Sequence, residues 1–598
     1  MCLINLKRTL ILNFESIEAE SMKVLDYLAG NPGSVISLDT EATGLRVAGD
    51  DTCIGVSLAA VINDTPISHY FPFFHKTGEN CSSAVLLKLK EVLEEGNHTL
   101  VFCNVQYDIL SLNTIYIYLD HTDFIDVPTV AHLINENKPF NKGLDSLAAF
   151  YLRDEGKVKD PVIDKEKKTG WENTTWQMMW EYAVRDAELT WRLWALLQEL
   201  PHWKELPADL WSHKQNLVRL LLSMKRHGVN IDVQLAQKYV QLGEEHMARL
   251  QEELGANPAS PKQLKKLLID DLGLPIVKSS VKTGAPSFDK QAMLAYDSML
   301  EELNSPVATQ IKEFRGWQKA VSAAYRPYLD LVDVDGRLRC SYRLHGTATG
   351  RLSCAEPNLQ QIPKSSDKPW NGKVKDCFIA QPGWKLINAD FSQLELRLAT
   401  AYAGEEELKI VFNEGRDIFT EMSKQLGMSR HDTKTLVYSM QYGAGEQRLM
   451  DAFNVTRERS KEIRQNYFTT YPNFRRFNER CTAKVEQSGK IKIWSGRERH
   501  FENRNDGYKA MNSVIQGGAA DIVERIMVRA FQELEGPECR ILLQVHDSIT
   551  FEVKEPAVPQ YVEKIRTLME DVNAVTGDVN FDVRFAVEVD SWVPEEDG

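Results

Sequence analysis

Apolar and polar residues follow different periods in different parts of the chain. Near the N-terminus, 35-VISLDTEATGL-45 begins as an apolar run of strand length. Apolar residues recur with a helical period in 214-KQNLVRLLLSMKRHGVNID-232, where Gly228 is suited to end the helix. Short apolar runs return in 386-LINADFSQLELRLA-399 and 541-ILLQVHDSITFEV-553, which we predict to contain strands. The pattern predicts a mixed protein with helix-rich segments between strand-bearing parts.

A further helical pattern places two cations and two aromatic rings at intervals of four residues. Its members are Arg430, Lys434, Tyr438 and Tyr442, followed by Gly443. Residues four apart share one face of a helix, so the stripe would be about 18 Å long. Two cations can hold a polyphosphate, and a ring can contact a base or sugar. The stripe indicates a nucleoside triphosphate lying along a helix, although a solvated basic face would give the same pattern.

Two acidic residues stand at the ends of strand-like runs on either side of this stripe. Asp390 follows one run, and Asp547 lies with His546 in a turn between two others. Neighbouring strands of one sheet would bring the two carboxylates together. They would then repel each other unless cations neutralised them. We therefore expect a pair of Mg²⁺ ions, about 3.5–4 Å apart, as in phosphoryl transfer.

A second set of acids lies near the N-terminus. Asp39 and Glu41 follow a strand-like run, and alternation puts both on one side of the extended chain. A second strand-like stretch, 100-LVFCNVQYDIL-110, supplies Asp108. An Asp-x-Glu pair by itself is usually surface charge, so another segment is needed to show whether these acids belong to a functional site.

That further segment is the helical stretch 181-EYAVRDAELTWRLW-194. It presents Tyr182 and Asp186 four residues apart, on one helix face. With the three acids before it, this segment makes a set of four carboxylates and one tyrosine drawn from three separate stretches.

Composition allows several domains in a water-soluble chain. The 598 residues predict about four domains, and 43% apolar with 26% charged residues is ordinary for globular protein. The net charge of −14 argues against a uniformly basic surface. A local basic stretch at 475–499 contains Trp494, which suits contact with a nucleic acid or, equally, a solvated helix and hairpin.

Cysteine usage and the absence of long apolar runs limit the location. The nine cysteines form no CxxC pair, which argues against structural zinc and fits a reducing cytosol. Residues 1–14 lack a signal-peptide pattern, and no run of about 18 apolar residues occurs. We expect a cytoplasmic protein without a membrane partner. An organelle remains an alternative.

Several of these segments, in order, resemble the motifs of family A DNA polymerases, most closely those of bacterial and phage members. The resemblance to motifs A, B and C is carried by 390-DFSQLELR-397, the stripe from Arg430 to Gly443, and 545-VHD-547. Further matches are 347-TATGRLSCAEPNLQQIP-363, 512-NSVIQGGAAD-521 and 258-PASPKQLKKLLIDDLGLPIVKSSVKTGAPS-287. The N-terminal acids resemble those of a 3′–5′ exonuclease of the DEDDy class. The ordered set covers nearly the whole chain.

The resemblance implies α/β and α+β domains: an RNase H-like exonuclease followed by a right-hand polymerase. The expected boundaries are 1–205 for the exonuclease and 206–598 for the polymerase, with the thumb at about 210–330, the palm at about 331–405 and 535–598, and the fingers at about 406–534. Asp39 lies so near the N-terminus that we expect no 5′-nuclease domain before it.

In the exonuclease domain, the resemblance implies a site that uses two metal ions. The metal ligands would be Asp39, Glu41, Asp108 and Asp186. Tyr182 would orient the attacking water.

For synthesis, the resemblance implies that Asp390, Asp547 and the carbonyl of Phe391 hold two metal ions. Each active site would bind two Mg²⁺ ions, which Mn²⁺ can replace. Arg430 and Lys434 would contact the triphosphate, and Lys434 would give a proton to pyrophosphate. The expected contacts to the rest of the nucleotide are Tyr438, Tyr442, Glu395 and Gln393. Of these, Glu395 would exclude a 2′-hydroxyl in partnership with Tyr442.

Four further residues would contact DNA. Arg351, Asn512 and Gln516 would read acceptors in the minor groove, and His546 would position the primer terminus. His546 as a packed turn residue and Gln516 as an ordinary polar helix residue remain alternatives.

Three positions depart from the family pattern. Ser548 stands after Asp547 where a glutamate is usual, which puts a third carboxylate in doubt. Phe419 replaces a histidine that would touch the triphosphate, and Tyr508 replaces a basic residue on the template side.

The leading hypothesis is a template-directed DNA polymerase with proofreading, acting in replication or repair of phage or bacterial DNA. Its partners would be primer–template DNA and dNTPs, with a helicase, primase or single-strand-binding protein as candidates, and we expect a monomer. One alternative is a 3′–5′ exonuclease with a non-catalytic DNA-binding polymerase fold. A single-subunit RNA polymerase is another, against which Glu395 and the exonuclease argue.

Overall fold

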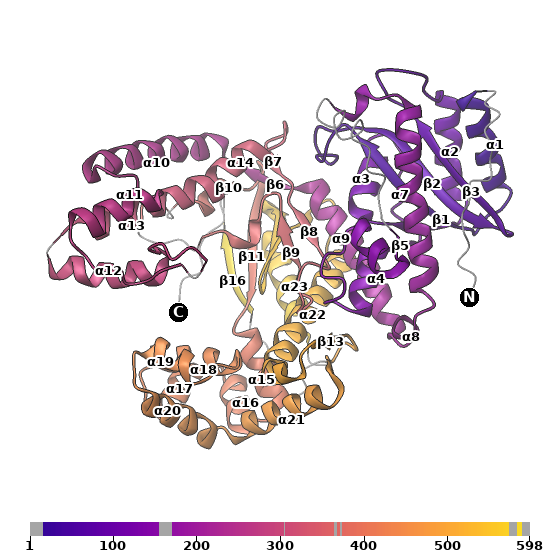
Figure 1. Cartoon of the computed structure of the whole chain (residues 1–598). Coiled ribbons are helices and arrows are strands. Elements are labelled where there is room, and N and C mark those ends of the chain that lie inside the picture. The colour runs from indigo at the N-terminus through magenta and orange to yellow at the C-terminus, as the bar shows by residue number, and fades with distance from the viewer. Residues whose placement is uncertain are drawn as a thin grey trace.

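The structure is a computed structural model that describes residues 16–154, 170–280, 282–303, 305–363, 368–370, 373–572 and 583–588. Residues 1–14 and parts of the segment that we expect to complete the palm, 573–582 and 589–598, lie outside the described residues. Figure 1 shows a domain at the N-terminal end, a helical lobe and a lower lobe arranged around a central sheet.

The N-terminal domain is built on a five-stranded sheet in the order β3-β2-β1-β4-β5. Its strands are β1 (Val35–Ala42), β2 (Cys53–Ile62), β3 (Thr65–Pro72), β4 (Thr99–Phe102) and β5 (Phe124–Asp126). β2 is antiparallel to β1 and β3, whereas β4 and β5 continue the sheet in parallel with β1. The helices are α1 (Ile17–Ala29), α2 (Ser83–Glu95), α3 (Val105–Asn113), α4 (Val127–Ile134), α5 (Leu144–Leu147), α7 (Trp176–Leu197) and α8 (Pro201–Lys204).

Burial in this sheet explains its sequence. Almost every residue of β2 is buried, because helix α7 contacts β1, β2 and β3. The mixed parallel and antiparallel order is that expected of an RNase H-like exonuclease.

A long helix leaves the N-terminal domain for the rest of the chain. α9 (Ala208–His227) ends at Gly228, whose φ of +60° favours glycine, as the sequence predicts. α9 packs against α3 in the N-terminal domain and against α22 and β14 of the other half. It therefore ties the two halves together.

The helical lobe, residues 233–331, has a core of its own. Its helices are α10 (Val233–Leu254), α11 (Pro261–Lys265), α12 (Lys290–Glu302), α13 (Val307–Ala320) and α14 (Arg326–Leu331). Leu264, Leu268, Tyr296 and Ile311 are buried in that core. The lobe projects away from the sheet (Figure 1).

The central sheet is antiparallel, with the order β14-β15-β11-β16. Its strands are β11 (Trp384–Phe391), β14 (Cys539–Val545), β15 (Ser548–Lys554) and β16 (Val583–Glu588). Helices α22 (Ala510–Glu533) and α23 (Val558–Glu570) pack nearby. Smaller strands form two further sheets, β10-β6-β7 and β8-β9: β6 (Val229–Ile231), β7 (Arg337–Leu338), β8 (Ser341–Arg343), β9 (Ser353–Ala355) and β10 (Phe378–Ile379).

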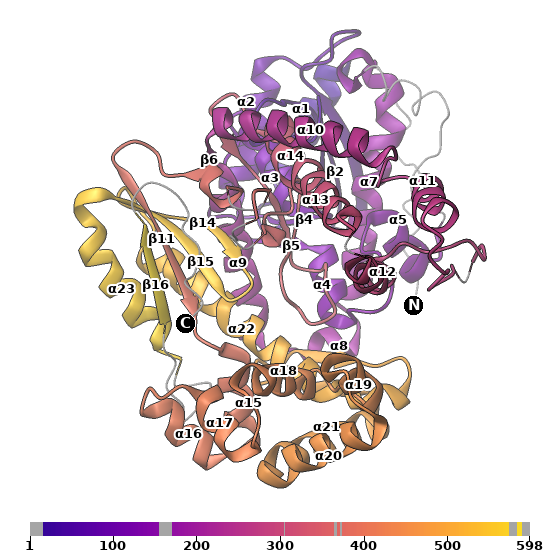
Figure 2. The same ribbon diagram turned by 90° about the vertical axis from the view of Figure 1, so that its left-hand side faces the viewer.

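The lower lobe, residues 404–509, is mostly helical. After α15 (Leu394–Ala403) it contains α16 (Glu406–Asn413), α17 (Ile418–Leu426), α18 (Arg430–Gln441), α19 (Glu446–Phe453), α20 (Arg457–Thr470), α21 (Pro472–Ser488) and a hairpin of β12 (Lys490–Lys492) and β13 (Glu498–His500). Figures 1 and 2 both place α18 on the upper side of this lobe.

Polar contacts hold the N-terminal domain against the other half. The buried Glu136 carboxylate accepts hydrogen bonds from the His500 backbone at 2.7 Å and ring at 2.9 Å, and pairs with Arg499. Arg46, in the loop after β1, donates to Asp333 at 3.1 Å. In the part of the chain that the structure describes, no helix is both long enough and apolar enough to cross a membrane.

Candidate functional site

In the central sheet, the two predicted acids lie at the same end of neighbouring strands. Asp390 is the next-to-last residue of β11 and pairs across from Ser548, the first residue of β15. The backbone N–H of Phe391 donates to the carbonyl of Asp547 at 3.3 Å. The predicted strands and turn are therefore confirmed, and Asp390 and Asp547 lie at the same end of paired strands.

The turn between β14 and β15 is tight. His546 and Asp547 alone connect Val545 to Ser548, and His546 has a φ of +56°, as short hairpin turns often require. The Ser548 hydroxyl is buried and donates to the Val545 carbonyl at 2.9 Å. At this departure from the family pattern the side chain therefore closes the turn.

A buried acid lies beside these carboxylates. Glu395 is in the first turn of α15, after Gln393, which caps the helix in a left-handed conformation with φ +56°. The Tyr442 hydroxyl donates to Glu395 at 3.3 Å, and Arg351 forms an ion pair with it. Burial raises the pKa of Glu395; the positive charge of Arg351 opposes this shift, and the negative charge of Asp547 adds to it. The predicted partnership of Glu395 and Tyr442 is present.

The cation stripe lies on α18 and its C-terminal cap. The helix ends at Gln441, and the N–H of the cap residue Tyr442 still donates to the Tyr438 carbonyl at 3.0 Å, so the spacing of four holds along the whole stripe. Gly443 follows with a φ of +69°, and a Cβ there would lie 2.9 Å from the Tyr508 carbonyl. The chain therefore has to leave the helix at Tyr442, which sequence spacing alone does not reveal.

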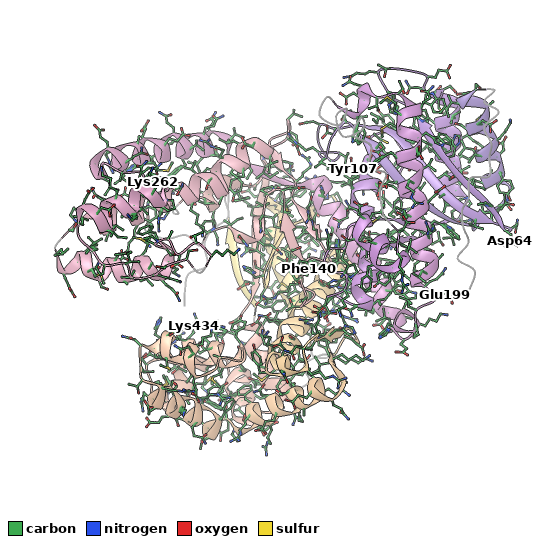
Figure 3. All side chains as sticks on the ribbon, in the orientation of Figure 1. Asp64, Tyr107, Phe140, Glu199, Lys262 and Lys434 are labelled. Atoms are coloured by element: carbon green, nitrogen blue, oxygen red, sulfur yellow. The ribbon has the colours of Figure 1, made fainter. Side chains whose placement is uncertain are left out.

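The Phe419 ring packs against three residues of the stripe. It is fully buried, and its ring centre lies 5.9 Å from the cationic groups of both Arg430 and Lys434. The Tyr438 ring is 5.8 Å away. Where the family pattern has a histidine, this chain therefore has an aromatic ring that lies close to both cations. Figure 3 places Lys434 on the upper side of the lower lobe, toward the helical lobe that carries Lys262.

Arg430 has a partner that sequence reasoning missed. Its Nε and Nη2 donate to the two Asp417 oxygens at 3.1 and 2.8 Å. These bonds hold the pKa of Asp417 well below its usual range. The Asp417 carboxylate thus accepts two parallel bonds from the guanidinium, in the same geometry that a phosphate would use. The only sequence signal was an acid in the same segment as Phe419.

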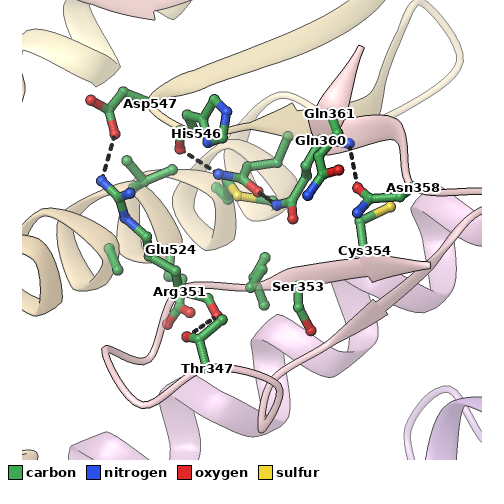
Figure 4. Close-up of a pocket in the computed structure, with 15 residues that line it drawn as sticks. Thr347, Arg351, Ser353, Cys354, Asn358, Gln360, Gln361, Glu524, His546 and Asp547 are labelled. Atoms are coloured by element: carbon green, nitrogen blue, oxygen red, sulfur yellow. Dashed lines mark hydrogen bonds and ion pairs between the residues drawn. The ribbon is translucent and has the colours of Figure 1, made fainter. Parts of the chain in front are cut away.

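A cavity of about 260 Å³ opens beside Asp547. Arg351, His546 and Asp547 line it, and Figure 4 shows Arg351 pointing toward Asp547, whose oxygen is 3.8 Å away. Gln360 and Gln544, not singled out from the sequence, also line it. Asn512 and Gln516 lie one turn apart on α22, one turn before Ala520 on the cavity wall.

The N-terminal acids come from three elements around β1. Asp39 and Glu41 lie on β1, Asp108 on α3, and Asp186 on α7, which packs on β1. Asp108 accepts hydrogen bonds from the Thr40 N–H at 3.0 Å and hydroxyl at 2.8 Å. The prediction that 100–110 forms a single strand is wrong. The strand β4 ends at Phe102, and the helix α3 begins at Val105.

The reason for this correction is Asn104. Its φ of +105° turns the chain between β4 and α3, and a short apolar run does not distinguish a strand from a strand followed by a helix.

Charge and burial in this region suit metal binding. Burial raises the pKa of Tyr107, and the negative charges of Glu41, Asp108 and Asp39 add to the shift, so all three acids act on this one hydroxyl. An all-oxygen donor set fits a hard divalent cation. As the described side chains are placed, however, no three His, Cys, Asp or Glu residues are grouped closely enough to hold an ion. Tyr182 is buried, 5.5 Å from the Trp171 ring.

Comparisons with known proteins match both halves. A family model described as DNA polymerase family A matches residues 229–593, and one described as 3′–5′ exonuclease matches residues 16–200. DNA polymerase I of Pseudomonas aeruginosa is 28% identical over 593 residues, covering 93% of this chain and 62% of that protein. The thermostable DNA polymerase I of Thermus aquaticus is 31% identical over 423 residues, covering 66% of this chain and 49% of that protein.

The chain thus spans between about half and three fifths of the length of these relatives. A solved structure, the polymerase domain of Pol1 from M. smegmatis in complex with DNA primer-template and dNTP, is similar with a TM-score of 0.76. It is 21% identical and covers 94% of this chain and 97% of its own, and at this identity it supports the fold.

Proposed function

Because the chain belongs to DNA polymerase family A and carries a 3′–5′ exonuclease domain, we propose that it copies a DNA template and removes its own errors. The chain would add dNTPs to a primer 3′-hydroxyl by phosphoryl transfer. The convergence of Asp390 and Asp547, joined through the bond from Phe391 N–H to the Asp547 carbonyl at 3.3 Å, is the observation that carries this proposal.

Family A polymerases and their exonucleases depend on divalent metal ions. For this chain we propose Mg²⁺, two per active site, with Mn²⁺ able to replace it. Asp390, Asp547 and the Phe391 carbonyl would hold the ions for synthesis. When bound, the ions supply activation of the primer hydroxyl and charge neutralisation on the triphosphate.

The remaining residues at this site bind and orient the nucleotide. Arg430 and Lys434 bind phosphate oxygens, and Lys434 donates a proton to the leaving pyrophosphate. Tyr438, Gln393 and the pair of Glu395 and Tyr442 contact the nucleotide. Bringing these groups together around a correct base pair supplies positioning and charge stabilisation.

The second site would degrade a mispaired 3′ end. Asp39, Glu41, Asp108 and Asp186 would hold its two ions, and Tyr182 would orient the attacking water. Their positions on β1, α3 and α7 are independent of the central sheet. The two activities therefore use separate residues.

DNA is the proposed macromolecular partner. Arg351, Asn512 and Gln516 would contact the minor groove, and His546 the primer terminus. In this proposal the helical lobe is the thumb, the central sheet the palm and the lower lobe the fingers. We propose a monomer in the bacterial or phage-infected cytoplasm that acts in replication or repair, with a helicase, primase or single-strand-binding protein as further partners.

The test is primer extension by the purified chain. With Mg²⁺, four dNTPs and a labelled primer on templates of different sequence, we expect products whose sequence follows the template. A chain that shortens the primer but never extends it would instead be a 3′–5′ exonuclease with a non-catalytic polymerase fold. Efficient extension with rNTPs would favour the RNA polymerase alternative.

A further inference from the structure

Tyr342 joins three parts of the molecule. It lies in β8, its strand partner Cys354 lines the cavity beside Asp547, and its side chain is buried. Its hydroxyl donates to the Gln544 carbonyl at 2.8 Å and accepts from the Gln544 backbone N–H at 2.9 Å. One side chain therefore satisfies both backbone groups of a residue in a different strand.

These two bonds matter because β14 is an edge strand. In the order β14-β15-β11-β16, the outer side of β14 faces no other strand of this sheet. Buried backbone groups on such an edge need a partner from outside the sheet. The Tyr342 hydroxyl supplies it two residues before His546.

The bracing continues toward the turn. The Gln544 side chain donates to the His546 carbonyl, and Gln360 donates to the Gln544 amide oxygen at 2.7 Å. Asp547 follows directly after His546. The place of Asp547 relative to Asp390 thus depends on the edge strand that Tyr342 holds.

Tyr342 is itself fixed from the other domain. Gln106, on α3 of the exonuclease domain, donates to the Tyr342 carbonyl at 2.9 Å. Burial raises the pKa of Tyr342 well above its usual value, so the hydroxyl keeps the proton that it donates. The backbone of Tyr342 is therefore held by the N-terminal domain, while its hydroxyl binds the Gln544 backbone.

We propose that Tyr342 is a positioning residue for DNA synthesis, which acts by holding Gln544 and hence the His546–Asp547 turn. This inference rests on the proposed function. Without the hydroxyl, the edge strand loses both bonds, and Asp547 spends less time where it can share metal ions with Asp390. The chemical step should suffer, whereas DNA binding and 3′ degradation should not.

The experiment compares Tyr342→Phe with Tyr402→Phe as a matched control. The Tyr402 hydroxyl is also buried but has no hydrogen-bond partner among the residues that the structure describes. Measurements are kcat and dNTP KM for primer extension, the Mg²⁺ concentration for half-maximal rate, primer–template affinity and the degradation rate of single-stranded DNA. For Tyr342→Phe we expect kcat to fall about tenfold and the Mg²⁺ requirement to rise, with DNA affinity and degradation unchanged. Tyr402→Phe should match wild type.

Wild-type kcat and Mg²⁺ requirement in a folded Tyr342→Phe variant would overturn the proposal. Failure of the wild-type chain to extend a primer would instead remove the proposed function on which it rests. If Tyr342→Phe does not fold, Gln544→Leu decides, because it removes the amide that braces His546. The same rise in Mg²⁺ requirement is expected there, and an unchanged one would equally overturn the proposal.

Discussion

The Tyr442 hydroxyl donates a hydrogen bond to the buried Glu395 carboxylate at 3.3 Å, although the two residues come from different helical segments. Arg351 pairs with the same carboxylate and lies 3.8 Å from Asp547. Glu395, Tyr442 and Arg351 thus form a linked wall beside Asp547. Because a hydrogen bond and an ion pair hold this wall in place, it has little freedom to move aside for the 2′-hydroxyl of a ribonucleotide.

Removing this wall should relax sugar selection. We expect Glu395→Ala to raise the ratio of rNTP to dNTP incorporation by at least about tenfold, or about 1.4 kcal/mol. Glu395→Gln is the matched control, because it keeps the volume and should keep most of the exclusion. The ratio is measured by competition between rNTP and dNTP. An Ala variant with the wild-type ratio would show that Glu395 is not the gate.

Tyr438 should determine how the chain treats dideoxynucleotides. Its ring packs 5.8 Å from Phe419, and burial raises its pKa to about 12, so it remains a hydrogen-bond donor at neutral pH. We propose that this hydroxyl replaces the missing 3′-hydroxyl of a ddNTP. A charge-assisted bond of about 1.5–3 kcal/mol corresponds to one to two decades in rate.

The chain should therefore incorporate ddNTPs readily, and Tyr438→Phe should discriminate against them with little loss of normal synthesis. The measurement is ddNTP against dNTP competition in an Asp39→Ala, Glu41→Ala background, where terminators are not removed. Strong rejection of ddNTPs by the chain with Tyr438 intact would refute this placement.

Asp417 should restrain nucleotide binding. It occupies Arg430 through two bonds, and both side chains are more than a third exposed, so the pair is screened and worth at most about 1 kcal/mol. Asp417→Asn keeps an oxygen that can cap α17 but removes the charge. We expect the dNTP KM to fall about threefold at unchanged kcat. A rise in KM would mean that Asp417 instead aims Arg430 at the phosphates.

Acid should loosen the contact between the two halves at Glu136. Burial by itself raises the pKa of this carboxyl, but the bonds from His500 and the charge of Arg499 outweigh it and lower the pKa. A carboxyl with a depressed folded-state pKa stabilises the fold above its unfolded pKa, about 4.3, and this stability is lost as pH falls through the folded value.

We therefore expect calorimetry below pH 4.3 to show separate melting of the two halves, and at pH 7 a more concerted transition. Glu136→Gln should melt in the same less concerted way at both pH values. Wild-type melting that keeps its shape down to pH 3 would contradict this role.

The sequence predicted the parts of the site that local patterns encode. Asp390 and Asp547 stand at the ends of apolar runs, and Arg430 and Lys434 follow helix spacing. Contacts between distant segments have no such period, so Asp417 beside Arg430 and Tyr342 beside Gln544 emerged only from the structure. The break between β4 and α3 was missed because one residue, Asn104, makes it.

Separation of the two active sites tests the account most directly. Asp547→Ala and the double variant Asp39→Ala, Glu41→Ala would be compared with wild type on a primer with a mismatched 3′ end, with extension and shortening followed in one assay. We predict that Asp547→Ala abolishes extension but still shortens the primer, whereas the double variant extends without trimming and makes more errors. Loss of both activities in a folded Asp547→Ala chain would contradict two independent sites.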